Sequence, residues 1–378
     1  MMSRRQEKGR LRLFDFKVLG ILLFLVAFIQ LACLGLKRQP FDLWFDSPSP
    51  TESHDNVFNS AGNATLGFQS IRYINLPTMF DKADALRMQS ASAGLKMFPF
   101  DAIGKDMIQE NGKGLPPSSA EKELKPEEKA CLRSHVELWH KMVEENIQTM
   151  LILEADAAWD VNIRDIHTRI ARGLHTLYSR FNPNSTVQPT PDDPYNSRTW
   201  DLISFGSCHD DKRFSDHSVI IKDPDSPLNQ SYYDTPLTDQ RVVRKAGYLV
   251  CTTGYALTLQ GAKRLLLRFA IDLNKPIDIL IADMILSGQL DSISVYPPTI
   301  AQWTYVSGIG AENLGSSIQN VDADKSKNAE EIWKSIYDEQ HIWDYKKSFQ
   351  HARLRNSAFE AFRRSAYPDF PQSESHYT

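Results

Sequence analysis

Cysteine is scarce in this chain, with only four among 378 residues. Cys33 lies in an apolar run, and Cys131, Cys208 and Cys251 are widely spaced beyond it. So few and so scattered cysteines exclude a disulfide framework and a zinc site of recognisable spacing. Two arrangements of the last three stay open: a single bridge between Cys208 and Cys251, or three buried free thiols.

The chain also lacks glycine-rich phosphate loops, internal repeats and an excess of basic charge. Its net charge of -4 argues against a nucleic-acid-binding protein, whose surface normally carries a basic patch. The length and a hydrophobic content of 42% allow one large α/β domain with appendages. These bulk properties do not identify a binding partner, so local sequence features must.

One long apolar run is present near the N-terminus. Residues 18–36 carry no formal charge, and a span of roughly 20 apolar residues can cross a bilayer as a helix. Basic residues are concentrated before this run, which predicts a cytoplasmic tail at 1–17 and a retained signal anchor at 18–36. A cleaved signal peptide is the alternative, although the run is longer than a usual signal h-region. Glycosylation sequons at Asn63, Asn184 and Asn229 agree with a lumenal body.

The remainder divides by composition. Residues 37–67 are rich in proline and small polar residues and are predicted to be a flexible stem. Strand-like and helix-like segments alternate through 68–350, which predicts a single α/β domain with a mostly parallel central sheet. Residues 351–378 form a basic C-terminal tail or helix. The expected strands are 70–76, 98–103, 150–156, 200–205 and 248–252, and the expected helices include 82–94, 126–145 and 261–270.

Two carboxylates follow the apolar run at 150–153. Side chains two residues apart on an extended strand point the same way, so Glu154 and Asp156 are expected to face one side. Hard cations such as Mn²⁺ and Mg²⁺ take oxygen ligands. The pair therefore predicts a metal and nucleotide site, and the alternative is a strand that ends in a capped turn.

A second pair of acids lies in an otherwise apolar stretch at 277–286. Burying an unpaired charge is costly, so Asp278 and Asp283 are expected to face a partner or a pocket. Asp278 is the first candidate for a catalytic base and Asp283 the second. Either could instead cap a helix.

The helix that begins at Pro126 carries an apolar stripe that includes Trp139. Trp139 is therefore expected in the core. His135 lies beside this stripe and could reach the carboxylate strand or be a satisfied core histidine.

Several blocks, taken in order, resemble glycosyltransferase family 25, in particular its fungal-type branch. The group includes lipooligosaccharide and collagen galactosyltransferases. The matching segments are 74–77, 128–139, 153–156, 200–208, 253–266, 276–278 and 296–298. The resemblance implies a GT-A-like fold, a UDP-galactose or UDP-glucose donor, Mn²⁺ (or Mg²⁺) and inversion at the anomeric carbon.

The resemblance also implies roles for particular residues. Glu154 and Asp156 match the outer acids of an acidic triplet whose middle position is here Ala155. The resemblance also implies that two segments contact the donor. One is the loop after the first strand, with Asn75, Leu76 and Lys82, and the other is the helix that begins at Pro126, with Ser134 and His135. That loop offers one lysine where the fungal branch usually has several arginines, and lysine does not reproduce bidentate phosphate contacts.

The sequence thus predicts a single-pass type II membrane glycosyltransferase of the Golgi or endoplasmic reticulum, with a lumenal catalytic domain. It would transfer a hexose from a UDP-hexose to a glycan or glycoprotein acceptor, without any nucleic-acid partner. Two alternatives remain. One is a catalytically inactive relative that binds a glycan or a protein, and the other is a membrane-anchored glycoside hydrolase with two opposed carboxylates.

Overall fold

The computed structural model describes residues 57–109, 111–306, 329–339, 342–344 and 354–368. The chain separates into two compact units, 1–54 and 55–378, and every described residue belongs to the second. The predicted cytoplasmic tail and anchor lie outside the described residues. Within the described part, no helix combines the length and the apolar character needed to span a bilayer.

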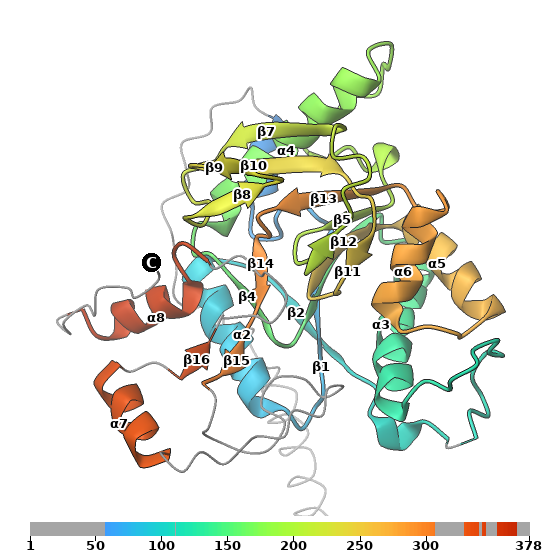
Figure 1. Ribbon diagram of the computed structural model, residues 1–378, viewed down its shortest axis with the longest axis horizontal. Helices are drawn as coiled ribbons and strands as arrows, with labels where there is room; N and C mark the ends of the chain where they lie inside the picture. The colour runs from blue at the N-terminus through green and yellow to red at the C-terminus, as the bar shows by residue number, and fades with distance from the viewer. Residues whose placement is uncertain (1–56, 110, 307–328, 340–341, 345–353, 369–378) are drawn as a thin grey trace, which may run out of the picture. The chain divides into compact units, whose positions relative to one another are not determined.

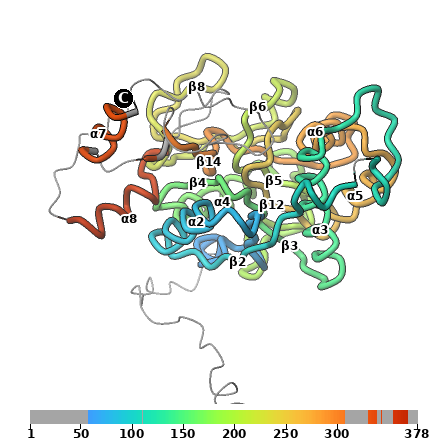
Figure 2. The backbone as a smooth tube through the Cα atoms, turned by 90° about the horizontal axis from the view of Figure 1, so that it is seen from below, coloured from blue at the N-terminus to red at the C-terminus, as the bar shows by residue number. Residues whose placement is uncertain are grey.

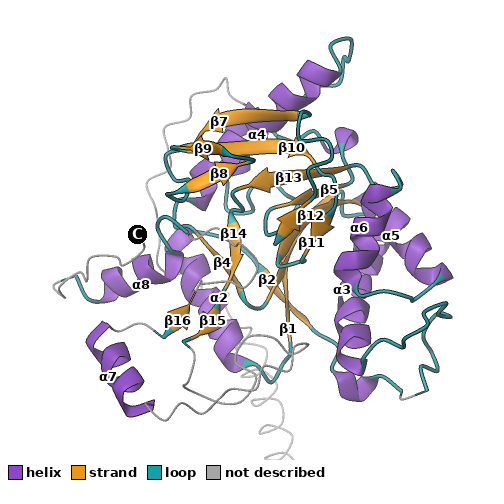
Figure 3. Ribbon diagram, viewed as in Figure 1, coloured by secondary structure: helices purple, strands orange, loops and turns teal. Residues whose placement is uncertain are grey.

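A mixed eight-stranded sheet forms the centre of this unit, in the order β2-β1-β3-β12-β5-β13-β10-β7 (Figures 1 and 3). Its strands are β1 (Ser70–Asn75), β2 (Phe98–Asp101), β3 (Thr149–Glu154), β5 (Leu202–Ser204), β7 (Ser218–Lys222), β10 (Gln240–Lys245), β12 (Gly254–Thr258) and β13 (Ser292–Tyr296). β1 runs parallel to β2 and β3, and β5 runs parallel to β13. The other neighbouring pairs are antiparallel. The α/β class is confirmed, but the expectation of a mostly parallel sheet is wrong.

The strand β12 accounts for much of this difference. It lies antiparallel between β3 and β5 and is buried along its whole length. A side chain at Gly254 would meet the side chain of Ile300 at 2.5 Å, so only glycine fits where the strand begins. The strand expected at 248–252 is reduced to β11 (Leu249–Val250).

Helices cover both faces of the sheet (Figures 1 and 2). On one face, α3 (Pro126–Glu144), α5 (Leu259–Ile271) and α6 (Ile277–Leu286) share a core with inward side chains such as Ile74 and Ile152. On the other face, α4 (Ile163–Phe181) shares a second core with Ile71 and Tyr73. The alternation of 71, 73 and 74 between the two cores follows from the period of two in a strand.

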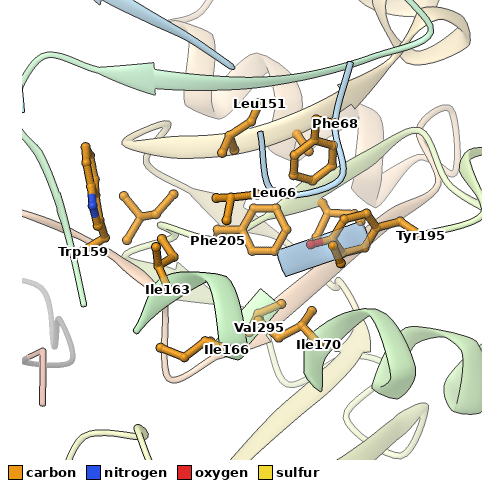
Figure 4. Close-up of a cluster of buried hydrophobic side chains, with 14 of the residues drawn as sticks. Leu66, Phe68, Leu151, Trp159, Ile163, Ile166, Ile170, Tyr195, Phe205 and Val295 are labelled. Carbon is orange, nitrogen blue, oxygen red and sulfur yellow. The ribbon is translucent and has the colours of Figure 1, made fainter. Parts of the chain in front are cut away.

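The folded body begins before the predicted boundary at residue 68. The 3₁₀ helix η1 (Val57–Gly62) contacts α4, and Ala61 and Leu66 are fully buried. The Phe68 ring stacks on Tyr195 with centroids 4.8 Å apart, inside the cluster drawn in Figure 4. The described part of the predicted stem, 57–67, is therefore packed into the core.

The C-terminal helix α8 (Ala358–Ala366) packs against α2 (Phe80–Ala93), and Phe359 is buried beside Trp303. This helix lies in the segment expected as a basic tail or helix. The remaining elements are η2 (Lys105–Met107), β4 (Ala157–Trp159), η3 (Ser197–Thr199), β6 (His209–Asp210), β8 (Gln230–Tyr232), β9 (Thr235–Leu237), β14 (Ile300–Gln302), β15 (Thr304–Tyr305), α7 (Ala329–Glu339) and β16 (Trp343–Asp344).

A disulfide joins Cys208 to Cys251, while Cys131 is free. Of the two arrangements left open by the sequence, the structure has the bridge. The bridge links the residue before β6 to the residue after β11, and these two strands pair as a short antiparallel ribbon.

Replacing both Cys208 and Cys251 with serine should lower the free energy of unfolding by about 3–4 kcal/mol, because the bridge restrains a loop in the unfolded chain. The bridged residues are 43 apart in sequence. Urea denaturation measures the difference. The wild-type chain in a reducing agent should match the double variant, and the variant should not respond to the reducing agent. Equal stability of all four samples would contradict the prediction.

Candidate functional site

The candidate site lies where the parallel strands β1, β2 and β3 end. Ile74 of β1 pairs with Glu154 of β3, so Asn75 and Glu154 emerge at the same edge. The antiparallel β12 begins there too, because Gly254 pairs with Leu153. The segment 251–253 therefore lies beyond the carboxyl ends of the parallel strands, where α/β sheets usually bind their ligands.

Glu154 is held by the two residues that precede β12. The Thr252 hydroxyl donates a 2.6 Å hydrogen bond to Oε1, and the Glu154 amide donates to the Thr253 carbonyl at 3.0 Å. The side chain remains 27% exposed. Its carboxylate is thus fixed in direction and accessible to a ligand.

His135 faces Glu154 from α3. Its Nε2 lies 3.7 Å from Glu154 Oε1, and its Nδ1 lies 2.9 Å from the Tyr255 hydroxyl. Trp139 Nε1 donates to the same hydroxyl at 3.0 Å. Burial raises the pKa of Tyr255, which therefore stays neutral. Trp139 lies in the core as expected. His135 has a hydrogen-bond partner in the core and also faces Glu154 at the end of β3.

Asp156 does not continue the strand. β3 ends at Glu154, and residues 155–156 form a turn, so the expectation of an extended chain through Asp156 is wrong. Asp156 is buried, and its Oδ2 accepts a 2.8 Å hydrogen bond from Gln302. Sequence alternation fails here because the chain reverses into β4 directly after Glu154.

Lys82 occupies the same neighbourhood as Asp156. Its ammonium group lies 3.8 Å from the centroid of the Trp303 ring, at cation–π distance. Burial lowers the pKa of Lys82, and the charges of Asp156 and Asp81 oppose that shift. Lys82, in the first turn of α2, is therefore directed to the Asp156 side of the site.

The acids also surround Cys131, on the same helix as His135. Burial raises the pKa of the Cys131 thiol well above its ordinary value, and the carboxylates of Glu154, Asp278 and Asp156 raise it further. The ligand atoms of Cys131, His135 and Glu154 all lie within 4.8 Å of one another. A region of negative potential therefore exists at this edge.

The structure separates the two acids of α6. Asp278 accepts hydrogen bonds from the amides of Ile279 at 2.9 Å and Cys251 at 3.4 Å. Burial raises its pKa, and the backbone hydrogen bonds oppose the shift while Glu154 adds to it. Asp283 instead forms a 2.6 Å ion pair with Lys275, and both side chains are partly exposed. Asp278 therefore faces the site, whereas Asp283 is engaged away from it.

Three other residues predicted to contact the donor, Asn75, Leu76 and Ser134, lie at this edge. Asn75 is buried and its amide donates to the carbonyls of Leu76 at 2.8 Å and Met79 at 3.2 Å, which closes the half-buried turn from β1 into α2. The Ser134 hydroxyl donates to the Ala130 carbonyl and accepts from the Ile103 amide, each at 2.8 Å. Ser134 thus has a structural role, fastening the segment after β2 to α3.

A larger pocket lies at the opposite edge of the sheet. Its volume is about 710 Å³, and Gln148, Thr258 and Ser292 place it where β3 and β13 begin and β12 ends. Size alone would favour this pocket. Chemistry favours the Glu154 edge, because acids, a histidine and a thiol gather there.

Comparisons with known proteins identify the family of the chain. The family model described as Glycosyltransferase family 25 (LPS biosynthesis protein) matches residues 69–281, which is more than half of the chain. The chain belongs to glycosyltransferase family 25. The matched range contains every site residue predicted from the sequence except Asp283, as well as Thr252 and Tyr255. Membership supports glycosyl transfer as the general activity.

Two curated relatives carry the name "Glycosyltransferase 25 family member". The protein from Drosophila pseudoobscura pseudoobscura is 25% identical over 241 residues, covering 61% of this chain and 32% of the relative. The protein from Anopheles gambiae is 28% identical over 151 residues, covering 39% of this chain and 18% of the relative. The matched part thus spans less than a third of either relative.

Sequence reasoning missed Cys131, Thr252 and Gln302 as parts of this site. The only available signal was the separation of four residues between Cys131 and His135, which puts both on one helix face. Thr252 and Gln302 reach the site through contacts between segments that are distant in sequence, and no local sequence pattern predicts such contacts.

Replacing Tyr255 with phenylalanine should lower the free energy of unfolding by about 1–3 kcal/mol. The change leaves the buried His135 Nδ1 and Trp139 Nε1 unpaired, and burying unpaired polar atoms is costly. Chemical denaturation measures the loss. Tyr337→Phe is the matched control, because Tyr337 is 72% exposed and should change stability by less than about 0.5 kcal/mol. Indistinguishable variants would contradict the prediction.

Proposed function

We propose that this chain is an inverting glycosyltransferase that transfers a hexose, galactose or glucose, from a UDP-hexose to a glycan or glycoprotein acceptor. The observation that carries the proposal is the gathering of Glu154, Asp278 and His135 at one sheet edge, inside the range that the family model matches. Glycosyl transfer by inversion needs a group that neutralises the leaving diphosphate and a base that accepts the acceptor hydroxyl proton.

The site suits a divalent cation of the Mn²⁺ or Mg²⁺ type. Glu154 and Asp156 would hold it, since both offer the carboxylate oxygens that hard cations prefer. Burial raises the pKa of the Cys131 thiol, and the charges of Glu154, Asp278 and Asp156 add to that shift, which supports a place for a cation among these carboxylates. When bound, such a cation would neutralise charge on the leaving diphosphate.

The chain's own side chains prepare the donor side. Thr252 orients Glu154 by a hydrogen bond, and His135, held by Tyr255, faces the same carboxylate, so Glu154 needs little reorganisation when a donor binds. Lys82 would provide a positive point charge to a phosphate oxygen from the Asp156 side.

Asp278 is the proposed base. Its raised pKa makes its carboxylate a stronger proton acceptor than an ordinary aspartate. A small cavity adjoins Asp278, Thr252 and Tyr255. The amide of Cys251 and the first turn of α6 fix the carboxylate beside this cavity.

A catalytically inactive glycan- or protein-binding relative is the second candidate. Two observations favour it. Ala155 packs against the core and offers no carboxylate, and the positive charge of Lys82 lies near Asp156, where it competes with a cation.

We further propose a Golgi or endoplasmic-reticulum location, with residues 18–36 as a type II anchor and the catalytic body in the lumen. The Cys208–Cys251 bridge supports an oxidising compartment. The sequon residues Asn63, Asn184 and Asn229 are all exposed, so each is accessible to the glycosylation machinery.

Glu154→Gln and Asp156→Asn should each lower hexose transfer by at least about 100-fold, because each removes a charged ligand for the cation. Transfer from UDP-galactose and UDP-glucose is measured with Mn²⁺, after chelation and after Mn²⁺ is restored. Glu144→Gln, an exposed acid at the end of α3, is the control. Undiminished transfer in both variants would refute the metal site, and a wild-type chain that neither turns over nor binds UDP would establish the inactive alternative.

Asp278→Asn should lower kcat by about 10²–10⁴-fold, the usual contribution of a general base. Asp283→Asn should leave kcat nearly unchanged, because Asp283 pairs with Lys275. The wild-type rate should rise with pH as Asp278 loses its proton, and this rise should lie at higher pH than for an ordinary aspartate, since burial raises its pKa. Steady-state kinetics across pH measure both effects. The reverse ranking of the two variants would assign the base to Asp283.

A further inference from the structure

Cys131 and His135 lie one turn apart on α3, so their side chains share one face of the helix. That face is turned toward Glu154 at the end of β3. The thiol, the imidazole Nε2 and the carboxylate thereby come from two elements that pack together, although nothing in their sequence spacing resembles a compact zinc motif.

The distances suit a tetrahedral metal. All three ligand atoms lie within 4.8 Å of one another, and His135 Nε2 is 3.7 Å from Glu154 Oε1. The second distance is longer than a hydrogen bond. It is close to the separation of about 3.5 Å between neighbouring ligands in a tetrahedral zinc site, where metal–ligand bonds are about 2.0–2.3 Å. Small side-chain rotations would complete the geometry.

Outer contacts orient the ligands in the manner usual for metal sites. The Tyr255 hydroxyl engages His135 Nδ1, so Nε2 is the nitrogen turned toward Glu154. Trp139 fixes that hydroxyl, and Thr252 fixes the carboxylate. Such contacts set the ring orientation and strengthen metal binding. Across the described residues, these three form the one group of at least three potential ligands that lie this close together.

We propose that Cys131, His135 and Glu154 bind a borderline-soft divalent cation of the zinc class, with a fourth coordination position left for water. The thiolate selects this class, because Mn²⁺ and Mg²⁺ prefer oxygen ligands. The partly exposed side chains of Cys131 and Glu154 give the cation a path from solvent.

The shared ligand has a consequence for activity. Glu154 also holds the cation of the proposed transferase, so zinc and that cation cannot use it independently. Zinc should therefore inhibit hexose transfer, and excess Mn²⁺ should relieve the inhibition. This consequence rests on the proposed function, whereas the zinc site itself does not.

Co²⁺ is the probe, since its thiolate complexes have a near-ultraviolet charge-transfer band that oxygen ligands do not give. The full chain carrying Cys33→Ser is used with its disulfide intact, so that Cys131 is the single free thiol. We expect the band to saturate at one Co²⁺ per chain and to disappear on addition of Zn²⁺. Cys131→Ser should abolish it, and His135→Gln should weaken Co²⁺ binding by at least about 100-fold.

His140→Gln is the matched control, because His140 is exposed on the same helix and should leave the band and the affinity unchanged. Thermal melting provides an independent measurement: Zn²⁺ should raise the Tm of the wild type and of His140→Gln but not of Cys131→Ser. Absence of the thiolate band, or its persistence in Cys131→Ser, would overturn the site. Zinc binding without inhibition would overturn only the competition, and the cobalt spectrum decides the site even in a chain that transfers no sugar.

Discussion

The Tyr255 hydroxyl is the contact on which the site depends. It joins α3 to the centre of the sheet, because Tyr255 lies on β12 and its hydroxyl meets both His135 and Trp139 of α3. The same contact turns His135 Nε2 toward Glu154. A polar bridge inside an otherwise apolar core fixes one relative placement of helix and sheet, whereas apolar packing alone tolerates several.

Patterns with strong local causes were predicted well. The helix beginning at Pro126 has the proline and the acids that favour a helix start, and Leu132, Val136 and Trp139 of its stripe are fully buried. The helix expected over 82–94 is α2, and Gly94 ends it in the left-handed conformation that glycine adopts readily. The apolar run before Glu154 forms β3 as expected, although the strand ends at Glu154 and not at Asp156.

The remaining features depend on contacts between distant segments. No strand was expected from the sequence between 206 and 247, yet this stretch contains β7 and β10. Arg241 is buried on β10 and pairs with the buried Asp223, so charged residues lie inside a strand where a sequence pattern would place them on the surface. The direction of β12 and the turn at Asp156 are likewise set by tertiary pairing. Asp278 and Asp283 could not be ranked until their partners, Cys251 and Lys275, were known.

The bridge between Cys208 and Cys251 has an effect beyond stability. Cys251 donates its amide to Asp278, and the next residue, Thr252, donates its hydroxyl to Glu154. A single covalent link therefore anchors the short peptide that positions both acids. The positions of the two acids therefore depend on formation of this disulfide. They depend in turn on the oxidising conditions under which the chain folds.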